Sequence, residues 1–179
     1  TRMLGNFSFF SRQTNTIYPP KLEVEWYDTK WNTGSLDPLS SRELEDLVFY
    51  MQSLRPEYKE SSKVKFRVVG RGRYPTKSFS NTSSEFLTVK YLPSGSISNI
   101  GGDGAYYSVL DSDTEDVIVP YGTGSLISCD STGNYFNLDM NGFQAERFYK
   151  FEFKVISGSG TVDETVEYFD DNFTFKVVR

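Results

Sequence analysis

Three acidic side chains near the middle of the chain are the best metal candidate. Asp111, Asp113 and Glu115 alternate, so an extended segment would place them on one face. Carboxylate oxygens on a flexible loop are the ligands that calcium prefers. However, no glycine follows at the EF-hand position and no terminal glutamate completes such a loop. The pattern therefore favours a solvated acidic turn over a calcium site.

The residue types restrict catalysis. The chain of 179 residues has no histidine and one cysteine, Cys129. These counts exclude a Ser-His-Asp triad, a Cys-His dyad, a histidine-ligated zinc and an internal disulfide. The acidic stretch 163–171 offers carboxylates for glycoside hydrolysis, which needs two of them at a fixed separation. A solvated loop is the favoured interpretation, so we predict neither an enzyme nor a cofactor.

Two binding surfaces are predicted from charged and aromatic residues. Arg71 and Arg73 lie in a Gly-Arg-Gly-Arg stretch that is either an exposed turn or a site for an anion or an acidic partner, such as another copy of the chain. Trp31, Tyr106 and Tyr107 are the candidates for stacking on a sugar, because aromatic rings present large apolar faces beside polar groups.

Charge is distributed unevenly along the chain. The net charge is -5, and residues 92–179 contain 14 acidic and 5 basic residues. An acidic second half argues against nucleic-acid binding, which needs basic surface for phosphates.

The apolar runs are far shorter than the ~20 residues of a membrane span, and the start of the chain lacks the pattern of a signal peptide. No contact with a membrane is therefore predicted.

The elements that would position these residues are mainly strands. Alternating polar and apolar residues, or short apolar runs between turns, indicate strands. They are expected over residues 21–26, 63–68, 86–91, 117–119, 126–129, 148–155 and 172–178. Ser40 to Glu43 resembles a helix-capping box, yet residues 47–51 favour a strand, so we predict a strand over 47–52 after one helical turn.

Residues 1–19 lack a clear period and are predicted to form an extended arm or linker. The arm contains Phe7, Phe9 and Phe10, and three phenylalanines are not expected to remain in water. They are expected to pack either on the chain's own domain or on a neighbouring protein. If they pack on a neighbouring protein, Phe7, Phe9 and Phe10 form a partner-binding site.

Four collinear matches at offsets of 85 to 89 residues suggest an internal repeat, for example Lys65 to Gly72 against Glu152 to Ser159. The competing explanation is that all strands share the same alternation. We predict two tandem β-sandwiches, at 20–91 and 92–179, each on the short side for an immunoglobulin-type sandwich.

Leu54, Pro56 and Tyr58, which precede the strand at 63–70, resemble the corresponding residues of fibronectin-III-like modules. The resemblance implies a fibronectin-III-like β-sandwich. The second half keeps Phe143 and Tyr149 but has Ala145 in place of the proline.

A wider resemblance covers residues 19–179. Stretches such as PPKLEVEW, KVKFRVVGR and YFDDNFTFKVVR are similar to virion structural proteins of contractile-tailed bacteriophages, especially cyanophages. This resemblance implies a tail, baseplate or neck component that is present in many copies and is assembled in the host cytoplasm. The implied partners are other virion proteins and copies of the chain itself. The alternative is an adhesion module that binds a glycan or receptor on the host surface.

Overall fold

The part of the chain that the structure describes contains nine strands, several of which have the alternating residues noted above. The computed structural model describes residues 29–74, 89–95 and 102–179. The strands are β1 (Leu47–Gln52), β2 (Glu57–Lys59), β3 (Lys63–Gly72), β4 (Gly104–Asp111), β5 (Val117–Val119), β6 (Ser128–Asp130), β7 (Gly133–Asp139), β8 (Phe148–Ser157) and β9 (Thr165–Val178). One short α-helix, α1 (Ser41–Glu45), and two 3-10 turns, η2 (Thr123–Ser125) and η3 (Met140–Gly142), accompany them.

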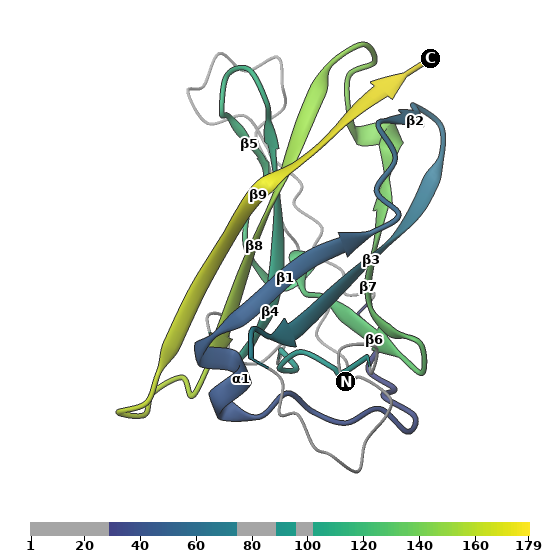
Figure 1. Ribbon diagram of the computed structural model, residues 1–179. Helices are drawn as coiled ribbons and strands as arrows, with labels where there is room; N and C mark the ends of the chain where they lie inside the picture. The colour runs from purple at the N-terminus through teal and green to yellow at the C-terminus, as the bar shows by residue number, and fades with distance from the viewer. Residues whose placement is uncertain (1–28, 75–88, 96–101) are drawn as a thin grey trace, which may run out of the picture.

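The strands form two sheets that pack face to face (Figure 1). The first sheet has the order β1-β3-β7-β6, and the second has the order β2-β9-β8-β4-β5. All neighbouring strands are antiparallel except β2, which runs parallel to the end of β9. The all-β part of the predicted fold class is therefore confirmed.

The core between the sheets is built largely from aromatic rings. Phe66 of β3 stacks on Phe136 of β7 with 5.2 Å between ring centroids, and Phe151 of β8 stacks on Phe175 of β9 at 4.7 Å. Across the sheets, Phe66 and Phe151 meet edge to face at 4.9 Å. Such pairs add to the free energy of burial when the rings are offset or perpendicular. One continuous core therefore joins the two sheets.

The structure does not show the predicted pair of tandem sandwiches. Strands from both predicted ranges share each sheet, because β3 pairs with β7 and β2 pairs with β9. Phe66 and Phe153, which the repeat aligned, are both buried but lie in opposite sheets. The physical reason is that strand alternation marks a half-buried strand without specifying its partner. The three strands described in the first range, β1, β2 and β3, pair with strands of the second range instead of forming a core of their own.

Several local predictions are confirmed. The helical turn followed by a strand appears as α1 and β1, and the Glu43 carboxylate accepts a hydrogen bond from the Ser40 backbone N–H at 2.8 Å. In β8 the inward face consists of Tyr149, Phe151, Phe153 and Val155, as alternation predicted. The predicted strand at 21–26 and the arm at 1–19, with Phe7, Phe9 and Phe10, lie outside the described residues.

Three strands were not predicted, namely β2, β4 and β7, and the last two are deeply buried. β4 is buried at all eight positions. β7 is buried at five of its seven positions. A strand that is covered on both faces loses the alternation that reveals a strand in a sequence. No helix among the described residues has the length and apolar character that crossing a membrane requires.

Candidate functional site: a basic hollow beside β2

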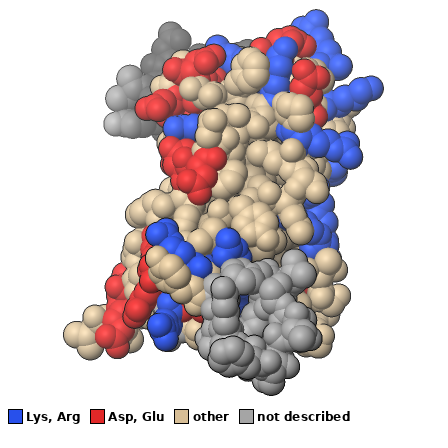
Figure 2. All heavy atoms as spheres, viewed as in Figure 1, with Lys and Arg blue, Asp and Glu red and all other residues tan. Residues whose placement is uncertain are grey.

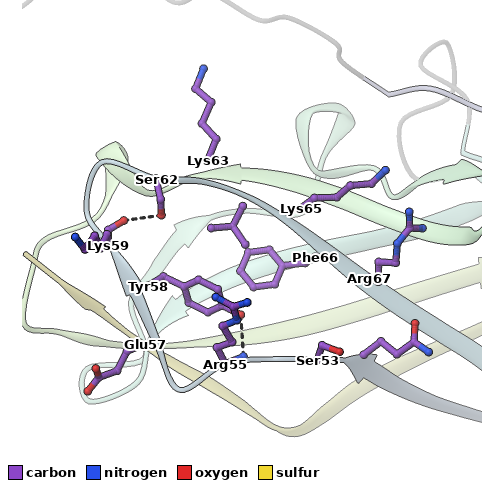
Figure 3. Close-up of a pocket in the computed structure, with 12 residues that line it drawn as sticks. Ser53, Arg55, Glu57, Tyr58, Lys59, Ser62, Lys63, Lys65, Phe66 and Arg67 are labelled. Carbon is purple, nitrogen blue, oxygen red and sulfur yellow. Dashed lines mark hydrogen bonds between the residues drawn. The ribbon is translucent and has the colours of Figure 1, made fainter.

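A hollow of about 750 Å³ opens at the edge of the sandwich, where β1 ends (Figure 3). We call it the basic hollow because five of its lining residues are Lys or Arg and one is acidic. It is lined by Gln52, Ser53, Arg55, Glu57, Tyr58, Lys59, Ser62, Lys63, Val64, Lys65, Phe66 and Arg67.

The hollow exists because the chain leaves the first sheet and returns to it. β1 ends at Gln52, and Ser53 then adopts a positive φ of 58°, which turns the backbone. The chain next reaches the second sheet, where β2 pairs with residues 176–178 of β9. It returns as β3, whose first residues extend beyond the register of β1, since Gln52 pairs with Arg67. Residues 53–62, which lead to the second sheet and back, and the start of β3, which β1 does not cover, together form the walls of the hollow.

The floor of the hollow is aromatic and is held in place by neighbouring groups. Tyr58 meets Phe66 edge to face at 5.1 Å and Phe175 at 5.8 Å. The Tyr58 hydroxyl accepts a hydrogen bond of 2.8 Å from the Arg55 backbone N–H (Figure 3). These contacts hold residues 53–62 against the core, so the backbone that carries Arg55 and Lys59 is fixed in place.

Only some of the positive charges of the hollow are neutralised within the chain. Lys65 and Arg67 both bind Asp130, at 2.7 Å and 2.9 Å. Lys63 lies 3.6 Å from the carboxylate of Asp139, and both side chains are well exposed. Arg55 and Lys59 have no carboxylate within ion-pair distance among the described residues. The hollow is therefore suited to an anionic partner, because its unpaired cations surround an apolar floor.

The ion pairs around Asp130 should make stability depend on pH. Hydrogen bonds from Arg67 hold the pKa of the Asp130 carboxyl well below its usual range, with help from Lys65 and the Thr132 N–H, whereas partial burial raises it. Because the pKa of Asp130 is lower in the folded chain, its contribution to stability is complete above about pH 5. It begins to decrease as the pH falls below about 4, the value of a free carboxyl, and disappears only as the pH falls through the lower folded-state pKa.

We therefore expect Asp130→Asn to lower the free energy of unfolding at neutral pH by about 1–2 kcal/mol, a figure reduced because the pair is partly solvated. The difference from the wild type should shrink in acid. Urea unfolding between pH 3 and pH 7 measures it, with Asp113→Asn as an exposed control. A constant difference across that range would contradict the assigned role of Asp130.

The calcium candidate is used in a turn. Asp111 is buried and accepts hydrogen bonds from the backbone N–H groups of Asp113 and Thr114, at 2.9 Å and 3.2 Å. It also pairs with Arg147 at 2.6 Å. These backbone bonds and Arg147 lower the pKa of Asp111. Asp113 and Glu115 are exposed, and the described ranges contain no group of three acidic or cysteine side chains that could hold a metal ion.

The predicted basic turn is part of a strand. Gly70, Arg71 and Gly72 belong to β3, where Arg71 pairs with Val48 of β1. Arg73 follows the strand, and its N–H donates to the Asp46 carbonyl at 2.8 Å. This is the opposite end of β3 from the basic hollow. The structure therefore does not bring Arg71 and Arg73 to the cations of the hollow.

The three aromatic candidates for sugar binding lie apart and are largely covered. Tyr106 and Tyr107 are 3% and 5% exposed, and Tyr107 stacks on Phe136 at 4.2 Å. Their rings serve the packing on the two faces of β4 and do not form an open platform. Trp31 is half-buried and meets Tyr91 edge to face at 6.0 Å. The structure does not gather the three residues into one site.

Cys129 is a buried side chain, as predicted. It is 1% exposed within β6, and burial raises its pKa to about 11. The thiol is therefore neutral at physiological pH and unsuited to nucleophilic attack.

The basic hollow itself was not predicted from the sequence. Lys63, Lys65 and Arg67 were interpreted only as the polar face of a strand. Arg55 and Lys59 had no assigned role, because nothing in the sequence places them beside β3. The available signal was five basic residues within residues 55–67 against two acidic ones.

Comparisons with known proteins give no match, whether the chain is compared with protein-family models, with curated proteins or with solved structures.

Proposed function

We propose that this chain is a non-enzymatic structural component of a bacteriophage virion and acts through contacts with other proteins. The resemblance of residues 19–179 to virion structural proteins of contractile-tailed phages motivates the proposal. Its partners would be other virion proteins and copies of itself. It would be assembled in the host cytoplasm and remain in the particle.

The observation that carries the proposal is the separation of charge on a rigid sandwich. Lys and Arg gather along the right side of the molecule, over β2 and the start of β3, whereas most Asp and Glu lie on the left side, from the top down to the β8–β9 hairpin (Figure 2). Complementary patches of this kind direct protein association and fix its orientation. The carboxylates of Asp111 and Asp130 are engaged in a turn and in ion pairs, which favours a scaffold over a catalyst.

One detail supports an immunoglobulin-like character for the sandwich. Near the start of β8 the Tyr149 hydroxyl accepts from the Gln144 N–H at 2.8 Å and donates to the Gln144 carbonyl at 3.1 Å. A tyrosine that bonds to backbone a few residues upstream resembles the tyrosine corner of such sandwiches. We propose this character for the single observed sandwich only.

The test is whether the chain is present in purified particles. We expect peptides from it to remain with phage particles through a density gradient, and antibodies against the purified protein to label the tail, neck or baseplate. If the chain is confined to the soluble fraction of infected cells, the proposal is wrong. The alternative of glycan binding loses support, since Tyr106 and Tyr107 are buried.

A further inference from the structure

We propose that the basic hollow of one copy binds the acidic tip of the β8–β9 hairpin of a second copy, so that copies associate head to tail. This inference rests on the proposed assembly function and names the partner. The acidic tip is residues 157–165, beyond the last pair of β4 with β8, and it contains two acidic residues, Asp163 and Glu164, and no Lys or Arg.

The hairpin projects beyond the rest of its sheet. β4 pairs with β8 only as far as Ile156, and the next pair, Ser157 with Thr165, joins β8 and β9 alone among the described strands. Figure 1 shows the hairpin reaching past the other elements at the lower left. A projecting two-stranded tip is a shape that enters a hollow on a neighbouring molecule.

The tip is also held in one conformation. Gly158 and Gly160 adopt positive φ values of 69° and 76°, as a tight turn requires. The Ser159 N–H donates to Asp103 at 2.6 Å, and the Gly160 N–H donates to the Glu164 carboxylate at 3.1 Å. An ordered tip loses less conformational entropy on binding than a loose loop does.

Apolar and charged groups of the tip match those of the hollow. Val162 is fully exposed at the end of the hairpin, and the floor of the hollow offers the half-buried ring of Tyr58, which packs on the buried Phe66. Asp163 and Glu164 have no cation within ion-pair distance among the described residues. Arg55 and Lys59 of the hollow likewise lack a carboxylate, so the two sets of unpaired charges are complementary.

The hollow and the tip lie at opposite ends of one molecule, so they cannot meet within it. β2 marks the upper right end in Figure 1, and the hairpin marks the lower left end. The contact must therefore join two copies, and it is heterologous because each copy contributes a different surface. Such a contact repeats into a ring or a filament.

A charge-swap experiment tests the proposal on the full chain. The hollow variant is Arg55→Glu with Lys59→Glu, and the tip variant is Asp163→Lys with Glu164→Lys. In each variant alone, the substituted side chains face like charges on the opposing surface. When the two are mixed, the acidic tip of the first meets the basic hollow of the second, and the basic tip of the second meets the acidic hollow of the first.

We expect the wild type to self-associate in sedimentation at about 0.05 M salt and to dissociate at about 0.5 M salt, because the Debye length shortens. Each variant alone should lose at least about tenfold in association constant, and the mixture should regain it. Asp113→Lys, an exposed acidic position outside the tip, is the matched control and should associate like the wild type. Asp163→Lys alone leaves the Glu164 turn intact and should show an intermediate loss.

A wild type that stays monomeric at sub-millimolar concentration overturns the inference, as does self-association that neither variant weakens or that mixing does not restore. Circular dichroism of each variant verifies folding. The outcome is separable from that for the proposed function, because a chain found in particles without this contact would still be a virion component.

Discussion

Replacing Phe66 with Ala is expected to lower the free energy of unfolding by about 3–5 kcal/mol and to weaken the whole sandwich in one transition. Phe66 belongs to the first sheet but meets Phe136, Phe151 and Tyr58 at centroid distances of 5.2, 4.9 and 5.1 Å. The cavity left by its ring would lie where the two sheets touch. Removing it therefore affects strands from both halves of the sequence.

The measurement is urea unfolding followed by two signals. Both tryptophans lie within the first 31 residues, so their fluorescence reports on the front of the chain, whereas far-ultraviolet circular dichroism reports on all strands. If the sandwich unfolds as one cooperative unit, the fluorescence and circular dichroism curves should coincide for the wild type and also for the Phe66→Ala variant. Phe148→Ala on β8 is the control, because that ring is 50% exposed and should cost much less.

Two separated transitions, with only one shifted by Phe66→Ala, would contradict the single sandwich. That result would instead favour two independent domains, as the repeat in the sequence suggested.

The second large effect is expected at Asn134, which is completely buried in β7. Its side-chain oxygen accepts from the Leu92 N–H, and its side-chain nitrogen donates to the Lys90 carbonyl, both at 3.2 Å. These two bonds attach the segment 89–95 to the first sheet. Asn134→Ala would remove the partner of both backbone groups, and the Leu92 N–H would be left unpaired where the surroundings are fully buried. Unpaired buried polar groups are costly, so we expect a loss of about 2–4 kcal/mol.

The matched control is Asn137→Ala, an asparagine that is exposed on the same strand. Thermal unfolding should show a decrease of several degrees for Asn134→Ala and little change for the control, since 1 kcal/mol corresponds to about 2–4 °C at this chain length. Hydrogen exchange should also accelerate at Leu92. Equal melting temperatures for the two variants would show that the two side-chain bonds contribute nothing to stability.

Strand prediction succeeded where one face of a strand is buried and the other is wet. β3 and β8 alternate in this way, and their inward residues Phe66, Phe151 and Phe153 were identified from alternation alone. β4 was not predicted, because both of its faces are covered and its sequence therefore shows no alternation of polar and apolar residues. Tyr106 and Tyr107 were consequently taken for surface residues.

The candidate site was less predictable than the strands. The basic hollow requires residues 53–62 to leave the first sheet, pair with the end of β9 and return. That excursion depends on contacts more than a hundred residues apart in the sequence, such as the pair Tyr58 with Val177. Local patterns carry no information about such pairings.

By itself, the sequence determined the composition of the core, the β class, the absence of histidine chemistry and the acidic character of the second half. These follow from residue type and local periodicity. Only the tertiary structure decided that strands from both halves share one sandwich, that Asp111 closes a turn and that the basic hollow and the tip of the β8–β9 hairpin lie at opposite ends. Those outcomes depend on which strands pair across long distances, and pairing is selected by the collective burial of side chains from the whole chain.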